Sequence, residues 1–143
     1  MNGKKEDNLY KTFLKQETLC VLATASKAGK PEAATIEFAV DEDENIYFST
    51  QSSYRKYKNI KENPYGFIVI TKPPHTLQIQ GGVRILQGKE AESAVDIICS
   101  KYGHSPKIYA KPEWKLCKFT PTEMQISEAP KWPTQYYDPR KLL

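Results

Sequence analysis

The chain has 143 residues, of which 39% are hydrophobic and 27% are charged, values that are ordinary for a soluble globular protein. We therefore expect a single domain over residues 1–143, with 128–143 as a C-terminal tail. No apolar run approaches the roughly 20 residues of a membrane-spanning helix, and a net charge of +4 does not require a nucleic-acid partner.

The N-terminal segment predicts a helix and no export signal. Residues 1–5 are polar and are followed by three more polar residues in place of an apolar stretch, so we expect no secretory signal and a cytoplasmic location. Leu9, Tyr10, Phe13 and Leu14 recur at helical spacing. This spacing predicts an amphipathic helix over 6–16.

Three strands are expected next. Apolar and β-branched runs at 19–25 and 33–40 flank turn residues at 27–31, which is typical of a hairpin. A charged turn at 41–45 then leads into a strand at 46–50. The turn resembles a calcium loop in part, but Ile46 and Ser52 stand where that loop needs Gly and Glu. We therefore expect a solvated turn.

A second helix is predicted from a cap at Ser52 or Ser53 to Glu62, because Asn63-Pro64 is a stop signal. A strand at 65–71 and a long strand at 76–86 follow, separated by residues 72–74. The Gly81-Gly82 pair in the long strand indicates a bulge or sharp bend, as barrel corners need.

The last part of the chain predicts one more helix and two short strands. Ala91, Ala94, Val95, Ile98 and Cys99 form one apolar stripe, which favours a helix over 89–102. A loop at 103–112 precedes strands at 114–119 and 124–126, separated by 120–122. From Ala129 on, the tail has no clear period. The many strands and few helices predict a mainly-β fold, a six- to seven-stranded antiparallel barrel with flanking helices.

Cysteine and histidine usage indicates no metal site. Cys20, Cys99 and Cys117 are odd in number and lie in apolar stretches, so we expect reduced core thiols. His75 and His104 have no Cys or His partner at ligand spacing. Exposed loop histidines are the expected interpretation for both, ahead of a catalytic role.

An anion site is indicated at residues 49–56, where a strand end, a hydroxyl-rich turn and a helix start meet. Arg55 and Lys56 fall in the predicted first helical turn, where a cation costs about 0.3–1 kcal/mol against the helix dipole. A bound phosphate would reverse the sign of that interaction, with Thr50 as a neutral donor. The alternative is that both cations are merely solvated on a lysine-rich helix that also carries Lys58 and Lys61.

From Leu19 to Gly81, and more weakly to about Ser127, the chain resembles the pyridoxamine 5′-phosphate oxidase-like, FMN-binding split-barrel family. The resemblance rests on the order and spacing of several short motifs: Ala23-Thr24-Ala25, Gly29-Lys30-Pro31, Ile46-Tyr47-Phe48-Ser49-Thr50, Tyr54-Arg55-Lys56 and Glu62-Asn63-Pro64. It implies a homodimer with FMN at the subunit interface and the phosphate at the turn before the first barrel helix.

Carried over by position, the resemblance implies three groups of cofactor contacts. These are Thr35, Ile36 and Glu37 along the flavin edge; Ser49, Thr50, Tyr54, Arg55 and Lys56 near the ribityl chain and phosphate; and Thr76 or Gln78 as a further polar contact. Ordinary strand packing is the alternative for Thr35, Ile36 and Thr76.

Three departures from the family pattern bear on activity. Ala34 and Ala39 replace a strand arginine and lysine of true pyridoxamine phosphate oxidases, and Tyr54 replaces a serine. The B6-binding Arg and His pattern of the C-terminus is absent as well; the tail offers Trp132, Tyr136, Tyr137 and Arg140. We therefore do not expect oxidation of a B6 phosphate.

The resemblance implies an FMN-dependent oxidoreductase with an unassigned small-molecule substrate or reductant. No residue is identified as catalytic; Glu37 either influences the flavin potential or is an outward-facing strand glutamate. The alternatives are a non-enzymatic flavin carrier or sensor, or a split barrel that holds haem or the deazaflavin F420. Nucleic-acid and membrane partners are not expected.

Overall fold

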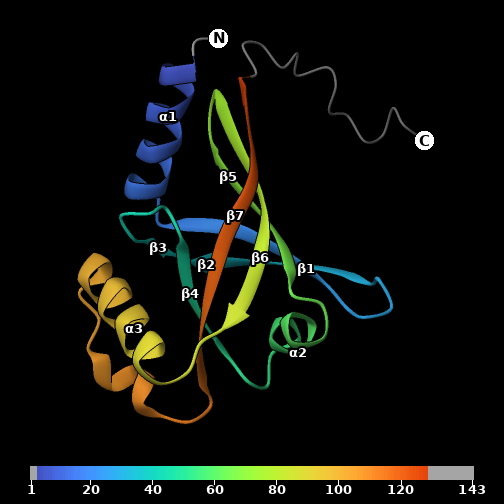
Figure 1. Ribbon diagram of the computed structural model, residues 1–143, viewed down its shortest axis with the longest axis vertical. Helices are drawn as coiled ribbons and strands as arrows, with labels where there is room; N and C mark the ends of the chain where they lie inside the picture. Colours follow the sequence, from blue (N-terminus) through green and yellow to red (C-terminus); the bar gives the residue numbers. More distant parts are fainter. Residues whose placement is uncertain (1–2, 129–143) are drawn as a thin grey trace, which may run out of the picture.

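The computed structural model describes residues 3–128 and is built around one sheet (Figure 1). The seven strands are antiparallel, in the order β2-β1-β5-β6-β7-β4-β3. The sheet curls into a half-barrel, which confirms the mainly-β split-barrel prediction. In chain order the elements are α1 (Gly3–Gln16), β1 (Leu19–Ala25), β2 (Pro31–Glu37), β3 (Ala39–Val40), β4 (Ile46–Gln51), α2 (Arg55–Glu62), β5 (Tyr65–Lys72), β6 (His75–Ile85), α3 (Gly88–Tyr102), the 3-10 helix η1 (Pro106–Ala110) and β7 (Trp114–Glu128).

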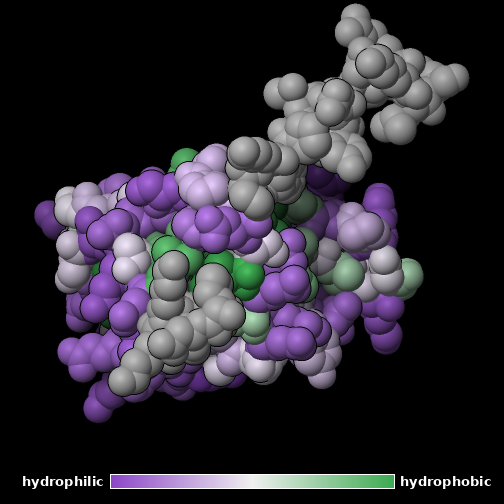
Figure 2. Space-filling view, turned by 90° about the horizontal axis from the view of Figure 1, so that it is seen from above, coloured by the Kyte–Doolittle hydropathy of each residue, from purple (hydrophilic) through white to green (hydrophobic). Residues whose placement is uncertain are grey.

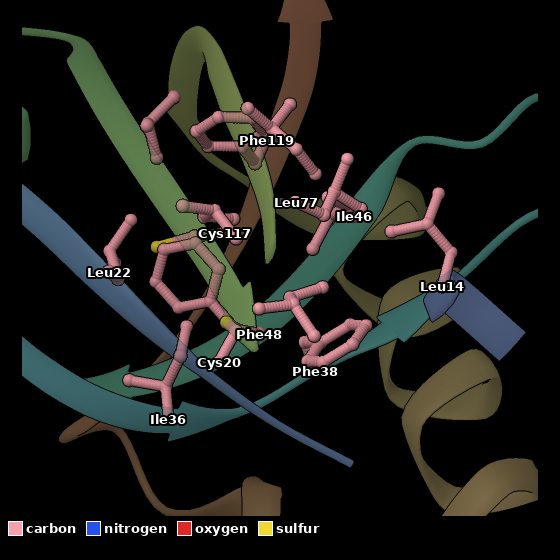
Figure 3. Close-up of a cluster of buried hydrophobic side chains, with 14 of the residues drawn as sticks. Leu14, Cys20, Leu22, Ile36, Phe38, Ile46, Phe48, Leu77, Cys117 and Phe119 are labelled. Carbon is pink, nitrogen blue, oxygen red and sulfur yellow. The ribbon is translucent and has the colours of Figure 1, made fainter. Parts of the chain in front are cut away.

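The main core fills the inside of the curled sheet. Its side chains come from α1, α2 and six of the strands, and those labelled in Figure 3 point toward one another. Phe38, Phe48 and Phe119 are fully buried in this cluster. Cys20 and Cys117 belong to it as free thiols, and burial raises the pKa of each to about 12, despite nearby lysines. Both cysteines are therefore core residues, as the sequence predicts.

A second, smaller cluster lies beneath α3. Ala94 and Ile98 of the helix pack on Tyr47, Leu116 and other side chains of the sheet. In Figure 1, α3 and α2 lie to either side of β4 and the end of β6. The two helices therefore cover different parts of the sheet: α2 packs mainly on β1 and β6, and α3 packs mainly on β3, β4 and β7.

The predicted strand at 33–40 is wrong in its bounds. The structure has β2 ending at Glu37 and β3 resuming at Ala39, where the chain stops pairing with β1 and pairs with β4 instead. The Tyr102 hydroxyl accepts a hydrogen bond from Phe38 N at 3.2 Å and lies 2.8 Å from Thr18 O. This long-range contact from α3 occupies the point of the switch, and local sequence gives no sign of it.

The predicted break at 120–122 is also wrong, because β7 is continuous. The register shifts between Gln80 and Gly81, so that Thr122 is an extra residue on β7. Pro121 is tolerated there because the ladder is interrupted at a bulge. A Cβ on Gly81 would come within 2.6 Å of the Phe119 ring and closer still to the Thr120 carbonyl. The predicted bulge at Gly81 is therefore confirmed, with its extra residue on the neighbouring strand.

Smaller features follow the sequence more closely. Asp41 closes the charged turn by accepting hydrogen bonds from Asp43 N, Asn45 N, Asn45 Nδ2 and the Tyr47 hydroxyl. Burial raises the pKa of Asp41, but these hydrogen bonds outweigh it and lower the pKa overall. The segment at 103–112 includes η1, which the loop prediction misses. His75 is half-buried as the first residue of β6 and contacts Phe13 edge-on, so the prediction of an exposed loop histidine is wrong there.

Seen from above, the described surface is mainly hydrophilic, with hydrophobic side chains gathered near its centre (Figure 2). Over residues 3–128, no helix combines the length and the apolar character needed to cross a membrane. The C-terminal tail, with Trp132, Tyr136, Tyr137 and Arg140, lies outside the described residues.

Candidate functional site

The start of α2 brings two cations to an uncapped helix end. Arg55 and Lys56 are its first two residues, and its first turn carries no acidic residue. The N-cap is Tyr54, with extended backbone angles (φ −81°, ψ 146°) and no side-chain capping bond within the described chain. The prediction of a Ser52 or Ser53 cap is therefore wrong, because the helix starts later. The first amides of a helix have no intrahelical partner, so this end attracts anions.

A groove of about 400 Å³ opens between this helix start and the β1–β2 hairpin. Its walls combine residues of both strands with the turn before α2 and the first two residues of the helix. They are Leu22, Thr24, Glu32, Ala33, Ala34, Ser53, Tyr54, Arg55 and Lys56. The groove therefore gathers Tyr54, Arg55 and Lys56 of the expected phosphate contacts, together with Ala34, the position where the resembled family has an arginine.

Two buried polar side chains fix the helix to the floor of the groove. Asn59 Nδ2 of α2 donates to Thr24 Oγ1 of β1 over 3.1 Å, and both residues are buried. Ile60 of α2 is buried in the main core beside them. A buried hydrogen bond of this kind is costly to break, so the position of α2 relative to β1 is set by packing and not by a ligand.

The two cations have different surroundings. Arg55 Nε lies 3.1 Å from Glu32 Oε2, and the arginine side chain is 82% exposed. Lys56 Nζ lies 4.6 Å from the centre of the Tyr54 ring. Within the part of the chain that the structure describes, Lys56 forms no ion pair. Burial lowers the pKa of Lys56, while the nearby Cys117 acts in the opposite direction. A partly buried, unpaired ammonium is a group that an anion would stabilise.

Ser49 and Thr50 lie on opposite faces of β4, and neither lines the groove. Ser49 lies beside Tyr109. Thr50 faces inward, is 1% exposed, and its hydroxyl has no hydrogen-bond partner among the described residues. An orphaned buried hydroxyl costs about 1–3 kcal/mol. It is therefore a feature that a bound ligand or water would explain.

The expected flavin-edge residues are divided between the two faces of β2. Ile36 is buried in the main core, whereas Thr35 and Glu37 face outward and are exposed. Thr76 and Gln78 of β6 also face outward. Thr35 and Gln78 stand in one row across β1 and β5, three strand spacings or about 14 Å apart. Within one chain these residues do not converge on a single point.

Glu37 has a partner that the sequence does not reveal. His104 Nε2 lies 3.3 Å from Glu37 Oε2, and the imidazole stacks on the Tyr102 ring with 5.4 Å between ring centres. These residues are 67 positions apart in sequence, and His104 directly follows the C-cap of α3. The pair places one carboxylate and one imidazole at the outer end of β2.

Glu32 is the site residue that sequence reasoning misses. Its position opposite Thr24 in the hairpin puts it on the inner face, in register with buried residues. The signal was present in the alternation of 31–37, which places Glu32, Ala34 and Ile36 on one side. An acidic residue among inward-facing positions is unusual enough to single out.

The outer face of the sheet presents apolar side chains to solvent. Leu19 and Val21 of β1 and Tyr65 and Phe67 of β5 are exposed there. Exposed apolar side chains that gather on one face of a sheet are typical of interaction surfaces. Over residues 3–128, no group of three or more His, Cys, Asp or Glu side chains could hold a metal ion.

The surroundings of Ala39 explain why it stands where the resembled family has a lysine. It is 1% exposed and packs in the cluster beneath α3, away from the groove. A lysine at this position would have to bury its charge. Ala34, by contrast, lines the groove, so its small side chain removes one cation from the site itself.

Comparisons with known proteins agree with this architecture. The curated pyridoxine/pyridoxamine 5′-phosphate oxidase of Ehrlichia ruminantium is 30% identical over 104 residues, which are 65% of this chain and 54% of that protein. This chain thus spans about half the length of that relative.

Two solved structures share the fold. A putative pyridoxamine 5′-phosphate oxidase from Listeria innocua has a TM-score of 0.68 at 20% identity, covering 85% of this chain and 97% of that one. The haem storage protein of Vibrio cholerae has a TM-score of 0.74 at 14% identity, covering 90% and 95%. The family model described as pyridoxamine 5′-phosphate oxidase matches residues 7–127. With most of its length matched, this chain belongs to the pyridoxamine 5′-phosphate oxidase family.

Proposed function

We propose that the protein binds FMN in the groove at the start of α2 and acts as a flavin-dependent oxidoreductase on a small molecule. One observation carries the proposal: Arg55 and Lys56 stand side by side in the first turn of an uncapped helix and line a groove. A phosphate dianion there would gain charge-assisted hydrogen bonds from both side chains and from free backbone amides.

The residues present fit a phosphomonoester. Lys56 lacks an ion-pair partner among the described residues, and it lines the groove together with Arg55 and the Ser53 side of the turn before α2. Ala34, on the β2 side of the groove, has a small side chain that leaves space for a ligand. From Ala34 to Glu37 the chain of β2 rises about 10 Å, a span along which the ribityl chain and ring system would extend.

The flavin supplies hydride and electron transfer when bound. This chain's own residues would hold the phosphate through Arg55 and Lys56 and lie along the ring through β2. Glu37, paired with His104, lies at the end of the strand along which we expect the ring to extend. No residue is assigned as a catalytic acid or base.

A homodimer is part of the proposal. Thr35, Glu37 and Gln78 are spread over the outer face of one chain, and the same face exposes Leu19, Val21, Tyr65 and Phe67. A second copy against this face would bury those side chains and bring its own polar groups to the flavin edge. Sedimentation of the purified protein tests this, since a monomer at micromolar concentration would contradict it.

B6 oxidation is not part of the proposal, because Ala34 lines the groove at a position where true pyridoxamine phosphate oxidases carry an arginine. A haem-binding alternative is supported by the fold shared with the Vibrio cholerae haem storage protein. A non-enzymatic flavin carrier would use the same groove without turnover. Bleaching of bound flavin by NAD(P)H or a substrate separates an oxidoreductase from a carrier.

The deciding experiment compares FMN with riboflavin, which lacks only the phosphate. Two charge-assisted contacts are together worth about 3 kcal/mol, so we expect riboflavin to bind about 100-fold more weakly. Quenching of flavin fluorescence measures both dissociation constants, and the absorption spectrum of the purified protein distinguishes flavin from haem. Equal affinity for the two flavins would contradict the phosphate site.

A further inference from the structure

The groove already contains an anion that belongs to the protein. Glu32 Oε2 lies 3.1 Å from Arg55 Nε, and the glutamate side chain is 22% exposed whereas the arginine side chain is 82% exposed. Glu32 is thus the more enclosed member of the pair. Its position in the strand, opposite Thr24, directs it to the groove wall and away from the outer face.

A carboxylate and a phosphate compete for the same donors. Both are acceptors only, and both bind the guanidinium group through N–H···O contacts. The groove holds two cations, Arg55 and Lys56, and one carboxylate, Glu32. A phosphate that contacts Arg55 would therefore either displace Glu32 from the guanidinium group or lie beside a like charge.

Resting on the proposed function, we propose that Glu32 is a specificity-determining residue that competes with the ligand's phosphate for Arg55. The Glu32 carboxylate holds the Arg55 side chain against β2 while no ligand anion is bound. It also lowers the gain that a dianionic phosphate obtains on binding. The wild-type groove consequently discriminates less between FMN and riboflavin than a groove with the same two cations and no Glu32 charge would.

The test is the variant Glu32→Gln, which keeps the shape of the side chain and an acceptor for Arg55 while removing the charge. We expect the dissociation constant for FMN to fall about tenfold, since one close like-charge repulsion is removed. The constant for riboflavin should stay within twofold. Glu62→Gln is the matched control, because it makes the same charge change at the exposed far end of α2.

Inorganic phosphate provides a second arm that does not involve flavin. Its half-saturation, followed through the amide shifts of Arg55 and Lys56 in ¹H–¹⁵N spectra, should also fall about tenfold in Glu32→Gln and not in Glu62→Gln. Unchanged or weaker binding of both FMN and phosphate by Glu32→Gln would overturn the inference, and weaker binding would mean that Glu32 positions Arg55 for the ligand.

The two arms separate the inference from the proposed function. If no variant binds FMN but phosphate binding tightens in Glu32→Gln, the flavin proposal fails and the role of Glu32 stands. If FMN binds to the wild type, Glu32→Gln and Glu62→Gln with equal affinity, the flavin proposal stands and the role of Glu32 fails.

Discussion

The starts of α2 and α3 are built alike in backbone and differently in charge. Both follow an extended N-cap without a capping side-chain bond, Tyr54 for α2 and Gln87 for α3. The first turn of α3 includes Glu90, which Arg84 Nη2 approaches to 2.7 Å. The first turn of α2 has Arg55 and Lys56 and no acid. The first turn of α3 also carries Lys89 and so holds one charge of each sign, whereas the first turn of α2 holds two cations, which oppose the helix dipole.

This difference separates a structural helix start from one that is arranged for binding. Opposed charges at α2 cost about 0.3–1 kcal/mol each, and the buried Asn59–Thr24 bond and Ile60 hold the helix in place regardless. Because packing stabilises α2, the helix tolerates two cations at its N-terminus. A bound anion would offset the cost of those cations, and variants at the starts of both helices can test this difference.

The largest expected effect comes from removing both cations of α2. The double variant Arg55→Ala, Lys56→Ala should weaken FMN binding by 100-fold or more, about 3 kcal/mol, because both phosphate contacts are lost. Its melting temperature should not fall, since neither side chain belongs to the core. Fluorescence quenching and thermal unfolding measure the two properties.

Lys58→Ala, Lys61→Ala is the control for that variant. It removes the same charge from the same helix beyond the first turn, and it should change FMN affinity by less than about threefold through long-range electrostatics alone. Equal losses in the two double variants would mean that the site responds to net charge and not to the helix start.

The next effect concerns Thr50, whose buried hydroxyl lacks a partner among the described residues. Thr50→Val keeps the volume, so the free protein should gain about 1 kcal/mol of stability to urea. Saturating FMN should leave this gain unchanged, because Thr50 is buried and does not line the groove. A gain that shrinks or reverses with FMN would mean that the ligand reaches the hydroxyl.

Capping residues sharpen the comparison at a smaller scale. Tyr54→Ser and Gln87→Ser each place a hydroxyl at an N-cap that has no capping bond now. We expect about 1 kcal/mol of stabilisation at α3 and about half of that at α2, where the contact of Lys56 with the Tyr54 ring is lost. Urea unfolding of both variants measures this, and a larger gain at α2 than at α3 would contradict it.

The smallest effect is expected at Glu90. Its hydrogen bond from Arg84 lowers the pKa of the carboxyl group. A lowered folded-state pKa stabilises the protein above the unfolded pKa of about 4.3 and loses that contribution as the pH falls through the folded value. Glu90→Gln should therefore slightly lower the melting temperature at pH 7, and this difference should shrink as the solution is acidified. A difference that does not shrink on acidification would rule out the ionic explanation.

Local patterns predicted most of the elements and not the points where distant segments meet. The β1–β2 and β5–β6 hairpins and the bulge at Gly81 follow from turn residues and strand propensities. The end of β2 before Phe38 depends on Tyr102, which lies 64 residues away. The continuity of β7 through Pro121 depends on a register shift against β6. Such tertiary contacts leave no trace in a local window.

The site shows the same division. The placement of Arg55 and Lys56 in the first turn of α2 is confirmed, because Asn63-Pro64 and the preceding strand limit where the helix can lie. The alternation of 31–37 indicates that Glu32 faces inward, but its pairing with Arg55 and that of Glu37 with His104 depend on the fold. The pairing of ions from different elements is therefore the part of this site that sequence reasoning could not supply.

A crystal structure of the protein with FMN tests the central claim most directly. The account predicts a phosphorus atom in the groove, with phosphate oxygens in hydrogen-bond contact with the Arg55 guanidinium and Lys56 ammonium groups and with the first amides of α2. Flavin bound elsewhere, with Glu32 still paired to Arg55 and no anion at the helix start, would contradict it.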